Sequence, residues 1–269
     1  MSARHLAGLA AAILLAVAPV PAAASHKVAR CTAPKEVTRF NVALPNTARA
    51  VRRGKALVIV TIGSSSTQGA GASGPAHAYP ALLAEELRRR WPRLAVVVLN
   101  MGVGGETSDQ MLTRFARDVM PYRPHLVIWQ TGSNHVLKKG DMLGYAETIR
   151  EGIGRLKAAR MDVVLMDPQY APRVLARLVH RRVVDSIRAV ASDLKVGVFQ
   201  RFAVMRHWVA SGQHKVEEIV ARDRLHMNDV SYSCIARLLA DSLTAAARAT
   251  PLPPDGGSAS EPRAENTPR

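Results

Sequence analysis

Side chains that could act together as a nucleophile and a base stand far apart in this 269-residue chain. Three consecutive serines lie in the segment 63–69, which begins and ends with glycine. Near the other end of the chain, Asp223 precedes His226 by three residues. An aspartate at that spacing can fold back in a turn and accept a hydrogen bond from the imidazole Nδ1–H, which leaves Nε2 to take a serine proton. These residue types predict a Ser-His-Asp arrangement for nucleophilic catalysis.

Two further segments offer hydrogen-bond donors for the negatively charged oxygen of a tetrahedral intermediate. Gly105, in the segment 101–106, has no side chain to obstruct a substrate that approaches its backbone N–H. Asn134, in the segment 131–135, offers a side-chain amide. Together with the backbone N–H of the attacking serine, these groups predict an oxyanion hole.

The elements that would position these segments follow a repeating strand–helix pattern. Apolar runs rich in β-branched residues predict five strands, at 56–62, 95–100, 125–130, 162–166 and 196–199. Helical patterns alternate with them, at 79–91, from 107 onward, at 141–156, 172–194 and 231–248. Such alternation predicts a mainly parallel sheet with helices on both faces. Sheets of this kind bind ligands at the carboxyl ends of their strands, where polar segments follow the apolar runs here.

The polar segments resemble, in order and in spacing, the sequence blocks of the SGNH (GDSL-like) hydrolase family. Those blocks centre on a Gly-Asp-Ser motif, a Gly, a Gly-x-Asn-Asp motif and an Asp-x-x-His motif, and they correspond here to 63–69, 100–107, 132–135 and 223–226. The resemblance covers roughly residues 56–245. It implies a three-layer α/β/α flavodoxin-like fold with a five-stranded sheet. It also implies carboxylic ester hydrolysis through an acyl-enzyme, with no metal or other cofactor.

The resemblance implies a role for each matching residue. Ser65 corresponds to the nucleophile, His226 to the general base and Asp223 to the residue that orients His226. The oxyanion hole would be formed by Ser65, Gly105 and Asn134.

Two positions depart from the family's pattern. Ser64 stands where the family has an aspartate before the nucleophile, and His135 stands where an aspartate follows the asparagine. Neither is a triad or oxyanion position, so the departures bear on loop support and substrate class more than on mechanism. Alignment with Thr67 and Gly69 puts the nucleophile at Ser65, with Ser64 as the alternative.

Other polar residues offer competing interpretations. Four histidines are rivals to His226 as the base, although none has an aspartate three residues before it: His77, His135, His207 and His214. His135, Asp167 and Tyr170 also follow predicted strands. There they are expected either to contact the substrate or to support loops and cap a helix.

The first 24 residues have the layout of a secretory signal peptide. Arg4 precedes an apolar run at 6–17, Pro19 and Pro21 interrupt it, and the alanines at 22–24 offer a small-residue cleavage site. The apolar run is short for a bilayer span, although an uncleaved anchor is the alternative. We therefore expect a periplasmic or secreted protein with no transmembrane segment in the mature chain.

The rest of the chain divides into three predicted parts. Residues 25–50 are expected to form an N-terminal extension, 51–248 the hydrolase domain, and 249–269 a disordered tail rich in Pro, Gly, Ser and charge. The chain has two cysteines, Cys31 and Cys234. In an oxidising compartment they form one disulfide or remain unpaired, and the sequence alone leaves both possibilities open.

The chain is strongly basic, with a formal net charge of +16. Its basic residues are scattered over several predicted helices, without the interleaved aromatic residues that stack on bases. This distribution argues against a nucleic-acid partner and favours a solvated basic surface.

The sequence thus predicts an exported serine esterase that acts on a small-molecule or glycan ester. The acyl group would be an O-acetyl group on a glycan or another short-chain acyl group. One alternative is an O-acyltransferase, in which a sugar hydroxyl replaces water at the same triad. The other is a binding module that kept the fold and lost activity, against which the complete set of Ser65, Gly105, Asn134 and His226 argues. The sequence leaves the oligomeric state open.

Overall fold

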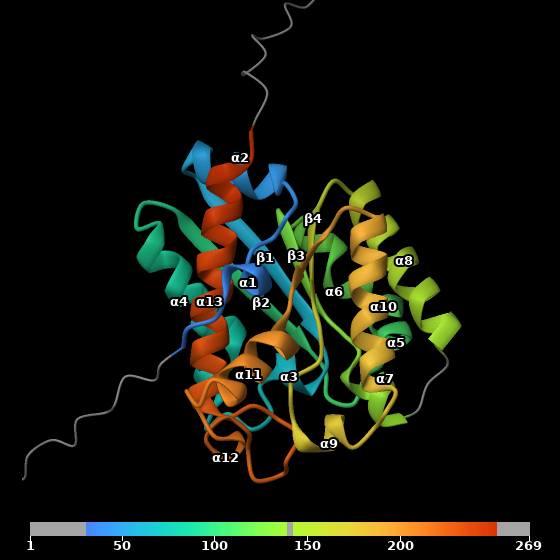
Figure 1. Cartoon of the computed structure of the whole chain (residues 1–269). Coiled ribbons are helices and arrows are strands. Elements are labelled where there is room, and N and C mark those ends of the chain that lie inside the picture. Colours follow the sequence, from blue (N-terminus) through green and yellow to red (C-terminus); the bar gives the residue numbers. More distant parts are fainter. Residues whose placement is uncertain (1–30, 139–141, 252–269) are drawn as a thin grey trace, which may run out of the picture.

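The computed structural model describes residues 31–138 and 142–251 (Figure 1). The predicted signal peptide and residues 252–269 of the predicted tail lie outside the described residues. Five strands form one parallel sheet in the order β2-β1-β3-β4-β5. They are β1 (Ala56–Gly63), β2 (Ala95–Gly102), β3 (Leu126–Gln130), β4 (Asp162–Met166) and β5 (Gly197–Phe199). The predicted α/β class and five-stranded sheet are confirmed.

Burial explains why the apolar runs become these strands. β3 and β4 are buried at every position, and β1 is buried at all but its first and third residues. Strands covered by helices on both faces need continuous apolar sequence, since neither face meets water. β2 lies at the edge of the sheet and is correspondingly more exposed.

The strand order changes direction between β1 and β3. β2 pairs with one side of β1 and β3 with the other, so the chain order reverses there. Crossover connections then leave β1 and β3 toward opposite faces of the sheet, and open α/β sheets bind ligands at the carboxyl ends of such strands. The polar segments that follow β1 and β3 therefore meet at one edge, as the sequence predicts.

Helices cover both faces of the sheet and complete three layers (Figure 1). α13 packs against α4 and α2 on one face, whereas α8 packs against α5 and α10 on the other. Within residues 31–138 and 142–251, no helix is long and apolar enough to cross a membrane. The α-helices are α1 (Lys35–Thr38), α2 (Pro45–Arg53), α3 (Ser65–Gln68), α4 (Tyr79–Arg90), α5 (Ser108–Thr113), α6 (Phe115–Asp118), α7 (Ser133–Lys138), α8 (Met142–Ala158), α9 (Pro172–Leu175), α10 (His180–Asp193), α11 (Arg201–Ala210), α12 (Val216–Ile219) and α13 (Asp229–Ala249), and the 3₁₀ turns are η1 (Pro75–His77) and η2 (Met120–Tyr122).

The sequence does not predict helix α2, because the side chain that caps its N-terminus, that of Asp162, is distant in the sequence. The side chain of Asp162, at the start of β4, accepts hydrogen bonds from the backbone N–H groups of Asn46 (3.3 Å) and Thr47 (2.7 Å). A carboxylate at this end satisfies amides that lack partners within the helix. The predicted boundary of the hydrolase domain at residue 51 falls within this helix.

Two predicted helices are interrupted. The stripe of Met111, Phe115 and Val119 is buried as expected, but the helix divides into α5 and α6 at Arg114. The Arg114 guanidinium donates to Glu106 Oε2 and to the Met101 carbonyl, so its side chain links this break to the end of β2. The predicted helix 172–194 likewise divides into α9 and α10.

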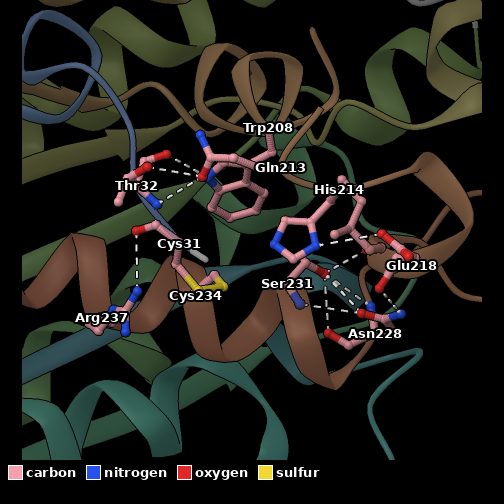
Figure 2. Close-up of a disulfide and its surroundings, with 11 residues drawn as sticks. Cys31, Thr32, Trp208, Gln213, His214, Glu218, Asn228, Ser231, Cys234 and Arg237 are labelled. Atoms are coloured by element: carbon pink, nitrogen blue, oxygen red, sulfur yellow. Dashed lines mark hydrogen bonds and ion pairs between the residues drawn. A yellow bond between two sulfur atoms is a disulfide. The ribbon is translucent and has the colours of Figure 1, made fainter. Parts of the chain in front are cut away.

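A disulfide joins Cys31 to Cys234 of α13, with the two Cα atoms 5.2 Å apart (Figure 2). This resolves the alternative left open by the sequence. Neighbouring hydrogen bonds also hold the N-terminal segment: Arg237 donates to the Cys31 carbonyl at 3.2 Å, and Trp208 Nε1 donates to the Thr32 carbonyl at 3.0 Å. The segment before α1 is therefore fixed to both α13 and α11.

We predict that removing the disulfide destabilises the protein. The bond joins residues 203 positions apart, so its loss frees a very long loop in the unfolded chain. The double variant Cys31→Ala/Cys234→Ala should lose about 2–5 kcal/mol of unfolding free energy. Urea unfolding of the variant and of wild type measures this, and reduced wild type is the matched control. Equal midpoints for oxidised wild type and the variant would contradict the prediction.

Candidate active site

Ser65 is the first residue of α3, and only Ser64 separates it from the end of β1. Its Oγ lies 2.8 Å from Nε2 of His226, although the two residues are 161 positions apart in the sequence. The turn that presents Ser65 is tight, and a Cβ added at Gly63 would collide with the side chains of Thr67 and Gln130. Glycine at the end of β1 leaves room for the Thr67 side chain and the Gln130 amide oxygen, which lie where a Cβ would stand.

A short turn joins Asp223 to His226. Asp223 Oδ2 contacts His226 Nδ1, while Oδ1 accepts hydrogen bonds from the backbone N–H groups of Leu225 (2.9 Å) and His226 (3.0 Å). Burial alone would raise the pKa of Asp223, but the hydrogen bonds from His226 and Leu225 outweigh it and lower that pKa below its ordinary value. The carboxylate therefore stays ionised and favours the tautomer with a proton on Nδ1, which leaves Nε2 facing the Ser65 hydroxyl.

Of the predicted oxyanion residues, Gly105 lies in the loop after β2 and Asn134 lies in α7. Gly105 has a φ of 78°, a left-handed conformation that favours glycine. The Asn134 side chain donates from Nδ2 to the Glu106 carbonyl at 2.8 Å, and Lys138 Nζ donates to the Gly105 carbonyl at 3.0 Å. Asn134 and Lys138 occupy the same short helix, α7, so α7 holds the loop that follows β2 from two points.

An ion pair and a backbone hydrogen bond to β1 also hold the loop that follows β2. Glu106 pairs with the guanidinium of Arg114, and both side chains are largely buried. The backbone N–H of Val103 donates to the Gly63 carbonyl at 3.0 Å, which continues the pairing of β1 with β2. The structure thus brings all five predicted site residues to one edge of the sheet: Ser65, Gly105, Asn134, Asp223 and His226.

Gln130 explains how the chain accommodates serine where the family has aspartate. Its Oε1 accepts from the Ser64 backbone N–H (2.9 Å), the Ser64 hydroxyl (3.0 Å) and the Thr67 hydroxyl (3.1 Å). Both Gln130 and Ser64 are fully buried. One amide oxygen at the end of β3 therefore holds the loop that carries Ser65. Sequence reasoning missed Gln130, and its only signal was a polar residue that closes an apolar strand.

The ambiguous residues act in support of the loops. His135 is buried, and its ring lies against Tyr145 of α8 at a centroid distance of 4.2 Å. Asp167 is fully buried and accepts from the Phe202 backbone N–H at 2.8 Å, at the start of α11. Tyr170 packs edge-on against the Phe202 ring. These contacts match the second interpretation of each residue, loop packing and helix capping.

The rival histidines are engaged elsewhere. His77 lies 3.9 Å from Asp229, His214 lies 3.8 Å from Glu218, and His207 contacts Gln213. In the described part of the chain, His226 is the histidine whose ring forms a hydrogen bond with Ser65.

The fold is also found in known protein structures. The structure is similar to a two-domain esterase active on acetylated mannans, with 20% identity and a TM-score of 0.66 over 80% of this chain and 57% of that one. It is also similar to a lipase/acylhydrolase from Enterococcus faecalis, with 20% identity and a TM-score of 0.60 over 70% and 96% of the two chains. An acetylxylan esterase from Geobacillus stearothermophilus gives 20% identity and a TM-score of 0.58 over 70% and 94%.

These likenesses show a shared fold, and this chain spans little more than half of the two-domain esterase. Comparison with the curated proteins finds no match. The model of the non-GDSL lipase-like family matches residues 30–249. That family description fits the segment 63–69, which reads Gly-Ser-Ser-Ser in place of Gly-Asp-Ser. The chain belongs to the non-GDSL lipase-like family, and the resemblance to SGNH (GDSL-like) hydrolases is confirmed.

Proposed function

We propose that this protein is a serine esterase that hydrolyses a carboxylic ester through an acyl-enzyme. The observation that carries the proposal is the 2.8 Å contact between Ser65 Oγ and His226 Nε2, with Asp223 on the far side of the imidazole. A hydroxyl beside a base, and a base beside an orienting group, is the geometry of an activated nucleophile.

In the proposed reaction, Ser65 Oγ attacks the ester carbonyl carbon while His226 Nε2 accepts the serine proton. Negative charge then develops on the carbonyl oxygen, where the Ser65 and Gly105 backbone N–H groups and the Asn134 amide would stabilise it. Collapse of this intermediate breaks the bond to the leaving alcohol, which takes the proton from His226. A water molecule, deprotonated by His226, then attacks the acyl-enzyme and releases the carboxylic acid and free Ser65.

The proposed substrate is an acyl ester of a small molecule or a glycan, with an O-acetyl group as the first candidate. Two structural neighbours are esterases of acetylated mannans and of acetylxylan, which supports this choice by analogy of fold.

We further propose that the protein is exported to the periplasm or the medium. The Cys31–Cys234 disulfide supports export, because such bonds persist in oxidising compartments.

The proposal predicts that wild-type protein turns over p-nitrophenyl acetate and is labelled by a serine-directed phosphonate. Ser65→Ala should remove both properties, because the acyl-enzyme cannot form without the Oγ nucleophile. Ser64→Ala tests the alternative nucleophile and should still be labelled by the phosphonate, since the Ser64 hydroxyl donates to Gln130 and not to His226. Wild type that neither hydrolyses the ester nor takes up the phosphonate would exclude the esterase. A glycan acetylated in preference to hydrolysis would favour the acyltransferase alternative.

The oxyanion role of Asn134 predicts a loss in rate with little change in binding. Asn134→Ala should lower kcat by roughly 10²–10³-fold, as removal of one oxyanion donor does in serine hydrolases, while KM changes little. Steady-state kinetics with p-nitrophenyl acetate measures both constants. Asn41→Ala, at an exposed asparagine near the other end of the sheet, is the control. A rise in KM at constant kcat would instead assign Asn134 to substrate binding.

The site also predicts a single-proton acid limb in the pH profile. The pKa of Asp223 lies below its ordinary value, so Asp223 is ionised throughout the range from about pH 5 to 8. A general base must be unprotonated to accept the serine proton, so the base is the group whose protonation stops catalysis. We expect log(kcat/KM) to rise with pH with a slope of about one before it levels. A profile that is flat over this range would rule out a histidine base.

A further inference from the structure

Gln169 lies in the loop after β4, which contributes no group to the proposed reaction. Its side chain is 1% exposed, so its amide is enclosed in the protein interior. A buried amide must find partners for its oxygen and its nitrogen, since an unmet hydrogen bond in the interior is costly. Three of the partners of Gln169 belong to the three segments that carry the proposed catalytic groups, and a fourth, Arg201, belongs to α11.

Each of the three partners in these segments is the immediate neighbour of a site residue. Gln169 Oε1 accepts from the Ser133 hydroxyl at 2.7 Å, and Ser133 directly precedes Asn134. The same oxygen lies 3.4 Å from the Ser66 hydroxyl, directly after Ser65.

The nitrogen of the amide faces the third segment. Gln169 Nε2 donates to the Leu225 carbonyl at 3.0 Å, and Leu225 directly precedes His226. A second bond reinforces this link, because the Arg173 backbone N–H donates to the Arg224 carbonyl at 3.1 Å. The loop after β4 and helix α9, which follows it, are therefore each joined to the Asp223–His226 turn.

Arg201 fixes which way the amide points. Its guanidinium is fully buried and donates from Nη2 to Gln169 Oε1 at 3.1 Å and from Nε to the Asp167 carbonyl at 3.0 Å. A guanidinium has no acceptor, so the atom of Gln169 that faces it must be oxygen. The opposite orientation would also place oxygen against the Leu225 carbonyl. One orientation of the amide thus fits all four of its contacts, with Ser66, Ser133, Arg201 and Leu225.

We infer that Gln169 is a positioning residue that holds the segments of Ser65, Asn134 and His226 at their working separations. The inference rests on the proposed esterase function. Nucleophilic attack requires the reacting groups to be placed to within a fraction of an ångström, and a misplacement of about 1 Å can lower the rate by about 10²-fold. Gln169 acts on that placement through Ser66, Ser133 and Leu225, without contact with the substrate.

The first experiment replaces the amide with an apolar side chain of similar size. Gln169→Leu should lower kcat for p-nitrophenyl acetate by about 10–100-fold, with KM nearly unchanged, because the groups remain but their separations are no longer held. Gln213→Leu is the matched control, since the Gln213 amide bonds to Thr32, away from the site segments. Circular dichroism and urea unfolding establish that each variant is folded during the assay.

A double-mutant cycle separates positioning from a general loss of stability. Ser133→Ala removes one hydroxyl, and it should lower kcat in wild type but much less in the Gln169→Leu background, since the contact is already absent there. If Gln169→Leu does not fold, Ser133→Ala alone decides the question. Wild-type kcat in folded Gln169→Leu or in Ser133→Ala, or equal losses from Ser133→Ala in both backgrounds, would overturn the inference. Inactive and unlabelled wild type would overturn the proposed function instead.

Discussion

The site depends on one contact, the 2.8 Å approach of Ser65 Oγ to His226 Nε2. The two residues reach each other because β1 lies inside the sheet and α13, which begins shortly after His226, packs against α4 and α2 on one face of the sheet. His226 stands just before Asn228, whose side chain accepts from the Ser231 N–H and begins α13. Docking of α13 therefore sets the position of the base. The distance between Ser65 Oγ and His226 Nε2 is therefore set by how α13 packs on the sheet.

The sheet and the reactive residues could be predicted because their signals are local. A buried parallel strand must be continuously apolar, so the runs that became β1, β3 and β4 are visible in the sequence. Parallel topology then sends the segments after the strands to one edge. Asp223 and His226 are three residues apart, and their pairing follows from the turn between them.

The supporting residues could not be predicted because their partners are distant. Asp162 begins α2 from 116 positions away, and Gln169 reaches Ser66 across 103 positions. In the sequence, Gln130 and Gln169 are single polar residues near strand ends, with no periodicity or motif. The role of a buried side-chain amide can be assigned only when the donors and acceptors around it are known. Sequence patterns thus identify what reacts, whereas the structure identifies what holds it in place.

The Cys31–Cys234 bond has a consequence for the integrity of the chain. Every residue assigned to the reaction or to its positioning, from Ser65 to His226, lies between these two cysteines. The bond therefore closes a covalent ring that contains the whole site. A protease that cuts one peptide bond within this ring leaves two fragments that remain attached through the sulfur atoms. Nucleophile and base cannot diffuse apart after such a cut, and a reductant is needed to separate them.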